Sequence, residues 1–190
     1  MHTNAGIDEA IKLASEKLET LDRDGVCART GAVWDGNRFL VPWLGKLCPL
    51  DEAEPAKKAL WLHYLISQGG GALTGNLIAF REVAGALFYE PLFYARSAKP
   101  IIKRFGRDAK GLLNAGLKLG GVKADYGDCA VSIPCFPKIP VTYIVWEGDG
   151  EMPPEASVLF DKSAAGWLCP EDLVFLASFG AFALIAQSSE

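Results

Sequence analysis

His63 is one of only two histidines in the chain, and it lies in the apolar segment 60–65, directly before Tyr64. A neutral imidazole in this setting can ligate a metal or a tetrapyrrole, or carry a proton. The alternative is a hydrogen-bonded histidine at the edge of the core. No second histidine stands one helical turn away, which excludes the two-histidine zinc pattern of helical metalloproteases. His63 and Tyr64 are the first candidate binding residues.

A glycine-rich segment, residues 69–76, follows the helix that we expect to carry His63. It lacks the Gly-Lys-Ser/Thr ending of a phosphate-binding loop, and it follows a helix rather than a strand. A helix end and a close crossing of two chain segments explain the glycines, and the alternative is a flexible ligand-binding loop. In that alternative Thr74 and Asn76 supply polar contacts, together with Arg81 and Glu82. Arg81 could hold a carboxylate through two hydrogen bonds.

An acidic turn lies at residues 146–155, where Glu147, Asp149 and Glu151 alternate with glycines and precede two prolines. We group Asp161, which follows shortly after, with these carboxylates. A structured hairpin turn whose carboxylates cap backbone amides explains the pattern. The alternatives are a site for a hard cation or a general-acid pair. The twelve-residue calcium loop ending in glutamate is absent.

The five cysteines are odd in number and widely spaced, and none forms a C-x-x-C pair. The local signature of a zinc ribbon or an iron–sulfur site is therefore missing, and we predict no metal ligands from them. The N-terminal residues show no secretory signal. Reduced thiols in the cytoplasm fit this pattern better than a disulfide framework.

The elements that must position these side chains follow from periodicity and turn signals. Apolar residues at helical spacing predict a first helix over residues 7–21 and a second over 55–67. A hairpin is predicted around residues 35–37, with its second strand running toward Cys48. The middle of the chain, residues 80–119, is mainly helical, and short strands follow at 122–125, 129–133, 141–146 and 157–160.

These elements predict an α+β fold in a single domain over residues 1–190, because the strands gather at both ends of the chain rather than alternating with helices. We expect the N-terminal and C-terminal strands to share one antiparallel sheet around the central helical region, and a C-terminal helix to begin at Pro170. Its apolar stretch, 173–186, is shorter than the roughly 20 residues that cross a bilayer, so we expect a buried helix with a tail anchor as the alternative.

The net charge of −4 over 190 residues argues against a nucleic-acid partner, which usually meets a basic face. Half of the residues are apolar, and 11% are aromatic, which excludes a disordered chain. Composition therefore indicates a globular domain, and only the motifs bear on its chemistry.

Several motifs resemble, in this order, a family known as domain of unknown function 3786, sometimes labelled a zinc finger. The resemblance covers about residues 30–180 and is carried by residues 62–65, 73–75, 80–82, 146–151, 153–154 and 159–164. The resemblance implies an origin in anaerobic bacteria and archaea. It also implies a role beside iron–sulfur and corrinoid modules of one-carbon metabolism. The cysteine spacings do not support the zinc-finger label. Gly150 stands where the family more often has an acidic residue, which weakens a metal cage at the turn.

The residues and the resemblance together predict a non-catalytic cofactor-binding or accessory protein of anaerobic redox or one-carbon metabolism. A corrinoid or another tetrapyrrole is the expected cofactor, and an iron–sulfur or corrinoid protein is the expected partner. Two alternatives stand beside it: a small enzyme that uses the carboxylates of the acidic turn with His63, and a structural subunit docking on a redox enzyme complex. The first hypothesis requires one aromatic-walled hollow that gathers the helix carrying His63, the Thr74–Asn76 loop and the Arg81 segment.

Overall fold

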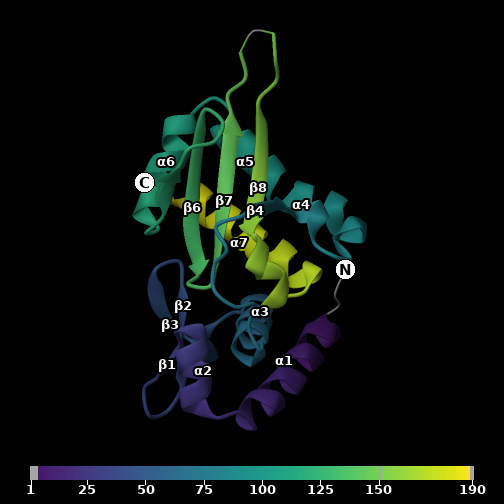
Figure 1. Ribbon diagram of the computed structural model, residues 1–190, viewed down its shortest axis with the longest axis vertical. Helices are drawn as coiled ribbons and strands as arrows, with labels where there is room; N and C mark the ends of the chain where they lie inside the picture. Colours follow the sequence, from purple (N-terminus) through teal and green to yellow (C-terminus); the bar gives the residue numbers. More distant parts are fainter. Residues whose placement is uncertain (1–3, 150, 189–190) are drawn as a thin grey trace.

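The first third of the chain forms three helices and a small antiparallel sheet. The computed structural model describes residues 4–149 and 151–188, so Gly150 and the second histidine, His2, lie outside the described residues. Helix α1 lies along α3, and α2 packs beside α3 (Figure 1). The elements are α1 Asn4–Glu19, α2 Arg23–Thr30, β1 Val33–Trp34, β2 Phe39–Trp43, β3 Lys46–Pro49, the short 3-10 helix η1 Leu50–Glu52, and α3 Pro55–Ile66.

The predicted hairpin is present, because Asp35 accepts hydrogen bonds from the backbone N–H groups of Asn37 and Arg38 and fixes the turn. Its second strand does not run on to Cys48, since Leu44 and Gly45, both at positive φ, turn the chain back into β3.

These three strands form a sheet of their own, in the order β1-β2-β3. The prediction that they share a sheet with the C-terminal strands is therefore wrong. Strands β1 and β3 occupy the two edges of β2. The two sheets meet instead through side chains and one hydrogen bond, from Leu44 N–H to the carbonyl oxygen of Cys135 at 3.3 Å.

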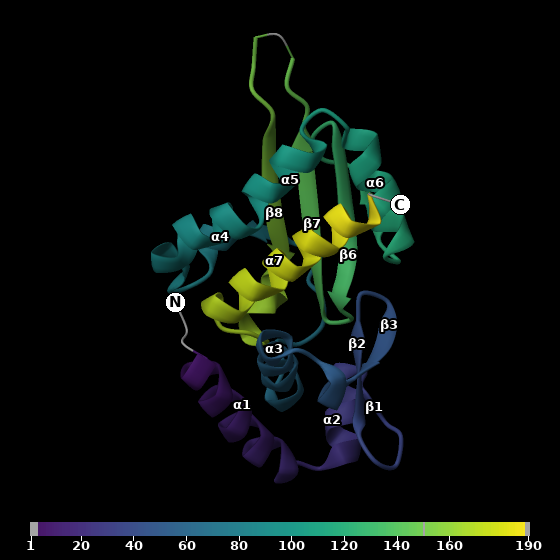
Figure 2. The ribbon, with the colours of Figure 1, turned by 180° about the vertical axis from the view of Figure 1, so that it is seen from behind.

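The rest of the chain builds a five-stranded antiparallel sheet in the order β4-β8-β7-β6-β5. Helices α4 to α7 cover one face of it (Figure 2). The elements are β4 Leu77–Ala79, η2 Phe80–Glu82, η3 Ala86–Tyr89, α4 Glu90–Arg96, α5 Ala98–Phe105, α6 Ala109–Lys118, β5 Val122–Ala124, β6 Cys129–Phe136, β7 Ile139–Trp146, β8 Glu155–Asp161, η4 Lys162–Gly166 and α7 Pro170–Gln187. The predicted C-terminal strands are confirmed.

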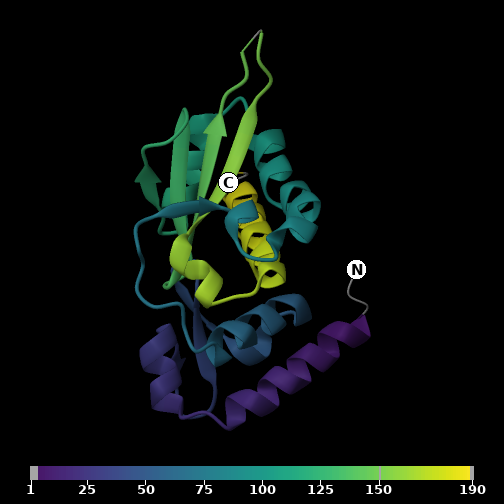
Figure 3. The same cartoon turned by 45° about the vertical axis from the view of Figure 1, so that its right-hand side comes forward.

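One hydrophobic core joins the two sheets. The ring of Phe136, at the end of β6, stacks on Tyr64 at 4.0 Å and meets Trp43 edge-on at 5.1 Å. Such offset and edge contacts add to the free energy of apolar burial. Figure 3 shows the segment after α3 running along the side of the molecule to β4, which connects the two parts. The α+β class is therefore confirmed.

Helix α7 is the one helix in the described ranges that is long and apolar enough to cross a membrane, and half of it is buried in the domain. It crosses the helical face of the sheet, where Tyr143 donates a hydrogen bond to the carbonyl oxygen of Ala177 at 2.7 Å. A Cβ at Gly180 would overlap the Tyr143 hydroxyl, so glycine permits this close approach. The helix is thus packed against the sheet, as the sequence predicts for a buried terminal helix.

Candidate functional site

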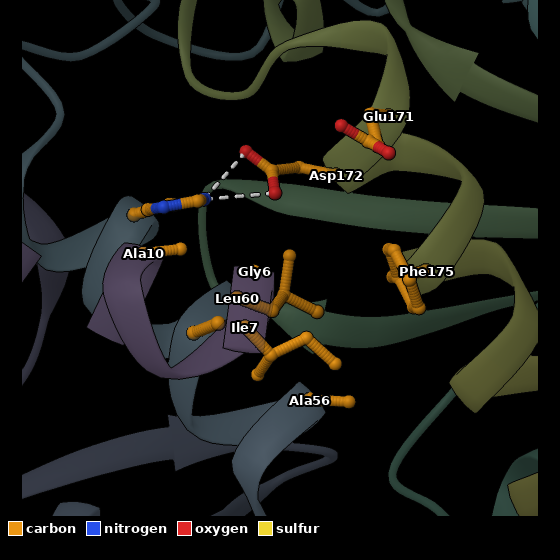
Figure 4. A pocket seen from close by; sticks show the side chains of 10 residues that line it. Gly6, Ile7, Ala10, Ala56, Leu60, Glu171, Asp172 and Phe175 are labelled. Carbon is orange, nitrogen blue, oxygen red and sulfur yellow. Dashed lines mark hydrogen bonds and ion pairs between the residues drawn. The ribbon is translucent and has the colours of Figure 1, made fainter. Parts of the chain in front are cut away.

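Helices α1, α3 and α7 meet around a hollow of about 130 Å³ (Figure 4). Its apolar wall combines Gly6, Ile7 and Ala10 of α1, Ala56 and Leu60 of α3, and Phe175 of α7. Its polar side combines His63 of α3 with Glu171 and Asp172 of α7. Cofactor pockets usually measure about 300–1,000 Å³, so this hollow admits a small group but not a whole macrocycle.

His63 and Asp172 form a hydrogen-bonded pair at this hollow. The Nδ1 atom of His63 lies 2.9 Å and 3.1 Å from the two carboxylate oxygens of Asp172. In Figure 4 two dashed lines that end on the Asp172 carboxylate mark these contacts. His63 lies in the last turn of α3, and Asp172 lies in the first turn of α7. Each helix dipole therefore favours the charge that its residue carries in an ion pair. Because a carboxylate only accepts, Nδ1 carries the proton, and in the neutral ring Nε2 keeps a free lone pair.

The pair changes the acidity of the imidazole. The hydrogen bond to Asp172 raises the pKa of His63 above its usual value; partial burial opposes this, and the negative charges of Asp172 and Glu171 add to it. One third of the His63 side chain is exposed, so solvent and ligands outside the hollow can reach the ring. A group with a raised folded-state pKa stabilises the fold at low pH and loses that contribution as the pH rises through the folded-state pKa.

Cys169 is the third group at this site. It precedes α7, and its Sγ donates to the second carboxylate oxygen of Asp172 at 3.3 Å. Cys169 is exposed to solvent, and partial desolvation of its sulfur, followed by the charge of Asp172, raises the pKa of the thiol to about 11. The thiol supports the Asp172 carboxylate as a weak hydrogen-bond donor.

A family model described as "Domain of unknown function (DUF3786)" matches residues 22–182. The chain belongs to the DUF3786 family. Neither the curated proteins nor the solved structures yield a match to it. The match includes His63, Cys169, Asp172 and Phe175, while the wall contributed by α1 lies before it. The residues matched by the DUF3786 family therefore include the polar side of the hollow, whereas the apolar wall formed by α1 lies outside the match.

Tyr64, the neighbour of His63, is a core residue of the DUF3786 domain. It is fully buried, its hydroxyl donates to the carbonyl oxygen of Thr30 at 2.7 Å, and burial raises its pKa well above the usual value. One residue along a helix turns the side chain by about 100°, which separates Tyr64 from the hollow that His63 lines. Tyr64 is therefore not placed to contact a ligand.

Thr74 and Asn76 belong to a loop that Asp161 holds in place. The Asp161 carboxylate accepts from the backbone N–H groups of Thr74 at 3.0 Å, Gly75 at 2.7 Å and Ser163 at 2.9 Å, and from the Thr74 hydroxyl at 3.1 Å. Burial alone raises the pKa of Asp161, but these donors outweigh it and lower the pKa to about 2. Asp161 thus anchors the glycine-rich segment and lies at the opposite end of β8 from the acidic turn.

The glycine-rich segment is a close crossing of two chain segments. A Cβ at Gly70 would overlap the carbonyl oxygen of Ser163 and would lie 2.6 Å from Cδ1 of Trp167. The neighbouring Asn76 carbonyl accepts from Lys162 N–H at 2.9 Å. The segment therefore fits the first of the two interpretations, a helix end followed by tight packing against η4.

Arg81 and Glu82 lie apart from the hollow. Glu82 accepts from the backbone N–H of Ala79 at 2.7 Å, which ends β4 and starts η2. The exposed Arg81 lines a different groove, of about 220 Å³, together with Glu90 and Tyr94 of α4. The structure thus does not bring Arg81 and His63 to one concavity.

The acidic turn joins β7 to β8 and projects beyond the end of the sheet (Figure 1). Glu147 accepts from the N–H of Ala109 at 2.7 Å, at the start of α6. Asp149 accepts from the N–H groups of Met152 and Glu151 at 2.7 and 2.8 Å, and these two hydrogen bonds lower its pKa. Glu147 and Asp149 therefore cap backbone amides, the first interpretation of this turn, and neither they nor the exposed Glu151 line the hollow.

Sequence reasoning missed the partner of His63. Asp172 is 109 residues away, and its position after Pro170 indicated only the start of a helix. An acidic residue in a first turn is favoured by the helix dipole in any case, so the sequence carried no separate signal for the pair.

Proposed function

We propose that this DUF3786 protein is a non-catalytic cofactor-binding or accessory protein whose His63 presents Nε2 to a metal centre or to a proton-donating ligand. The hydrogen bond between His63 Nδ1 and Asp172 carries this proposal. Histidines that ligate metals almost always donate their other N–H to a carboxylate, a backbone carbonyl or water, which fixes the tautomer and raises the basicity of the ligating nitrogen. The exposed third of the His63 side chain gives a ligand access to the ring.

The size of the hollow restricts how a tetrapyrrole would bind. A hollow of about 130 Å³ does not enclose a corrinoid ring, so the ring would lie outside and meet His63 through its metal alone. This arrangement suits an accessory role, in which an iron–sulfur or corrinoid protein of anaerobic redox or one-carbon metabolism brings the cofactor to His63. The free state of all five cysteines supports a reducing compartment, and we place the protein in the cytoplasm.

A spectroscopic titration with aquacobinamide tests the proposal. This corrinoid lacks its own lower base, so an imidazole that binds its cobalt shifts the visible absorbance. We expect a saturable shift with the wild type, none with His63→Ala, and about 10–100-fold weaker binding with Asp172→Asn, which removes the carboxylate behind the ligand. His2→Ala is the matched control, because it removes the only other histidine.

Two results would contradict the proposal: no shift with the wild type, or an equal shift with His63→Ala. The enzyme alternative has less support, because Glu147 and Asp149 are used as caps and the acidic turn does not line the hollow.

A further inference from the structure

A second and larger hollow, of about 310 Å³, lies where α1, α3 and the β1–β2 hairpin meet. Its floor consists of Leu18, Phe39 and Leu62, all buried, and the half-buried Trp34 forms one wall. The Trp34 and Phe39 rings meet edge to face, with centroids 5.0 Å apart. The volume lies within the range of small-molecule sites, and the apolar floor with charged groups at its edge is the usual design of such sites.

The three cations that line this hollow differ in whether they are paired. Arg38 lies 3.2 Å from Asp51 and 2.8 Å from Glu52, so its charge is neutralised within the protein. Lys58 and Arg23 also line the hollow, and neither has a carboxylate within 4 Å in the part of the chain that the structure describes. The Arg23 guanidinium instead lies over the Trp34 ring, 4.2 Å from its centroid.

Glu19 is the remaining carboxylate of this lining. Lys58 and Arg23 are therefore the two cations of this lining that are not engaged in an ion pair within the described part of the chain. A stacked guanidinium keeps its N–H edge free, and that edge can bind a carboxylate through two hydrogen bonds.

We propose that this hollow binds a small carboxylate with an apolar body, of the arylalkanoic acid class. The apolar body would rest on Leu18, Phe39 and Leu62, and the carboxylate would meet Lys58 and Arg23. This site is separate from the His63 hollow, since the two share no lining residue. The proposal therefore stands or falls independently of the proposed function.

Titration with 3-phenylpropionate, by calorimetry and by the NMR signal of the Trp34 indole N–H, tests this site. The Trp34 signal is identified by its loss in Trp34→Phe. The neutral 3-phenylpropionamide and the cationic phenethylamine serve as ligands of the same size and different charge. Lys58→Met and Arg23→Gln remove the two cations. Lys57→Met is the matched control, because Lys57 precedes Lys58 on α3 but pairs with Glu54 and does not line this hollow.

We expect 3-phenylpropionate to bind saturably and to shift the Trp34 signal, with weaker binding of the amide and the amine. Lys58→Met should weaken the binding of 3-phenylpropionate about tenfold, which is the scale of a hydrogen bond to a charged group at a partly exposed site. The affinity for 3-phenylpropionamide should stay unchanged. Lys57→Met should behave as the wild type. The proposal is overturned if 3-phenylpropionate does not bind, if the amide binds equally well, or if Lys57→Met loses as much affinity as Lys58→Met.

Discussion

Replacing Asp172 with Asn removes the negative charge that faces His63 Nδ1 while keeping an acceptor of nearly the same shape. In the wild type this contact is 2.9 Å long, and its two residues lie at helix ends whose dipoles favour the ion pair. The substitution should lower the pKa of His63, because the largest cause of its raised value is the hydrogen bond to Asp172.

The size and pH dependence of the effect follow from the same contact. A hydrogen bond to a charged group contributes about 1.5–3 kcal/mol, and the exposed third of His63 reduces this through solvent screening, which leaves about 1 kcal/mol. The folded-state pKa of His63 is raised. The free energy of unfolding of the wild type should therefore exceed that of the variant most below pH 6.5, where the imidazole of the unfolded chain is also charged. The advantage should shrink as the pH rises through the folded-state pKa.

Urea unfolding at pH 5.5 and pH 8.5, with an NMR titration of His63, measures both quantities. The matched control is Glu171→Gln, which neutralises the adjacent carboxylate in the same first turn of α7. It should lower the pKa of His63 less than Asp172→Asn does, because Glu171 acts only through its charge. If the two variants shift His63 equally, or if Asp172→Asn costs as much stability at pH 8.5 as at pH 5.5, the reasoning fails.

Three further predictions concern the frame around the site. Asp161→Asn should lower the free energy of unfolding in urea by about 2 kcal/mol above pH 4. Because the pKa of Asp161 is lowered to about 2, the stability difference between wild type and variant should vanish as the pH falls toward 2. Gly70→Ala should destabilise the fold by about 1–3 kcal/mol, because its Cβ would overlap Ser163. Gly71→Ala should cost only about 1 kcal/mol, because a Cβ there has open space and only the φ of 83° is unfavourable. Equal decreases in the thermal unfolding temperature of the two variants would contradict the close crossing. Tyr64→Phe should cost about 1 kcal/mol by calorimetry and leave aquacobinamide binding unchanged, since the Tyr64 hydroxyl bonds backbone groups of Thr30 and Lys138 inside the core. A loss of binding would place Tyr64 in the site.

Local signals predicted most of the elements. The turn at Asp35 and Gly36 predicted the hairpin, because a single side chain there caps two backbone amides. Helix α2 was missed, since Asp24 and Gly25 are typical of a helix end, whereas Asp22 caps a new helix through Gly25 N–H. Strand β4 was missed because its three residues owe their conformation to pairing with β8, a partner distant in sequence.

The candidate site was harder to predict than the fold. His63 was found by its rarity and its apolar neighbours, but Asp172 was not, because their contact depends on how α7 crosses the sheet. Arg81 and the acidic turn were grouped with His63 on chemical type alone. The structure separates them, since Glu82 ends β4 locally and Asp149 closes its own turn.

The protonation site of the His63 ring tests the central claim most directly. A nitrogen-15 NMR spectrum of the two histidine side chains, recorded above the pKa of His63, reports which ring nitrogen holds the hydrogen. Donation to Asp172 requires a single tautomer with the proton on Nδ1 and a bare Nε2. A proton on Nε2, or a rapid average of both forms, would show that Asp172 does not hold the ring ready for a ligand.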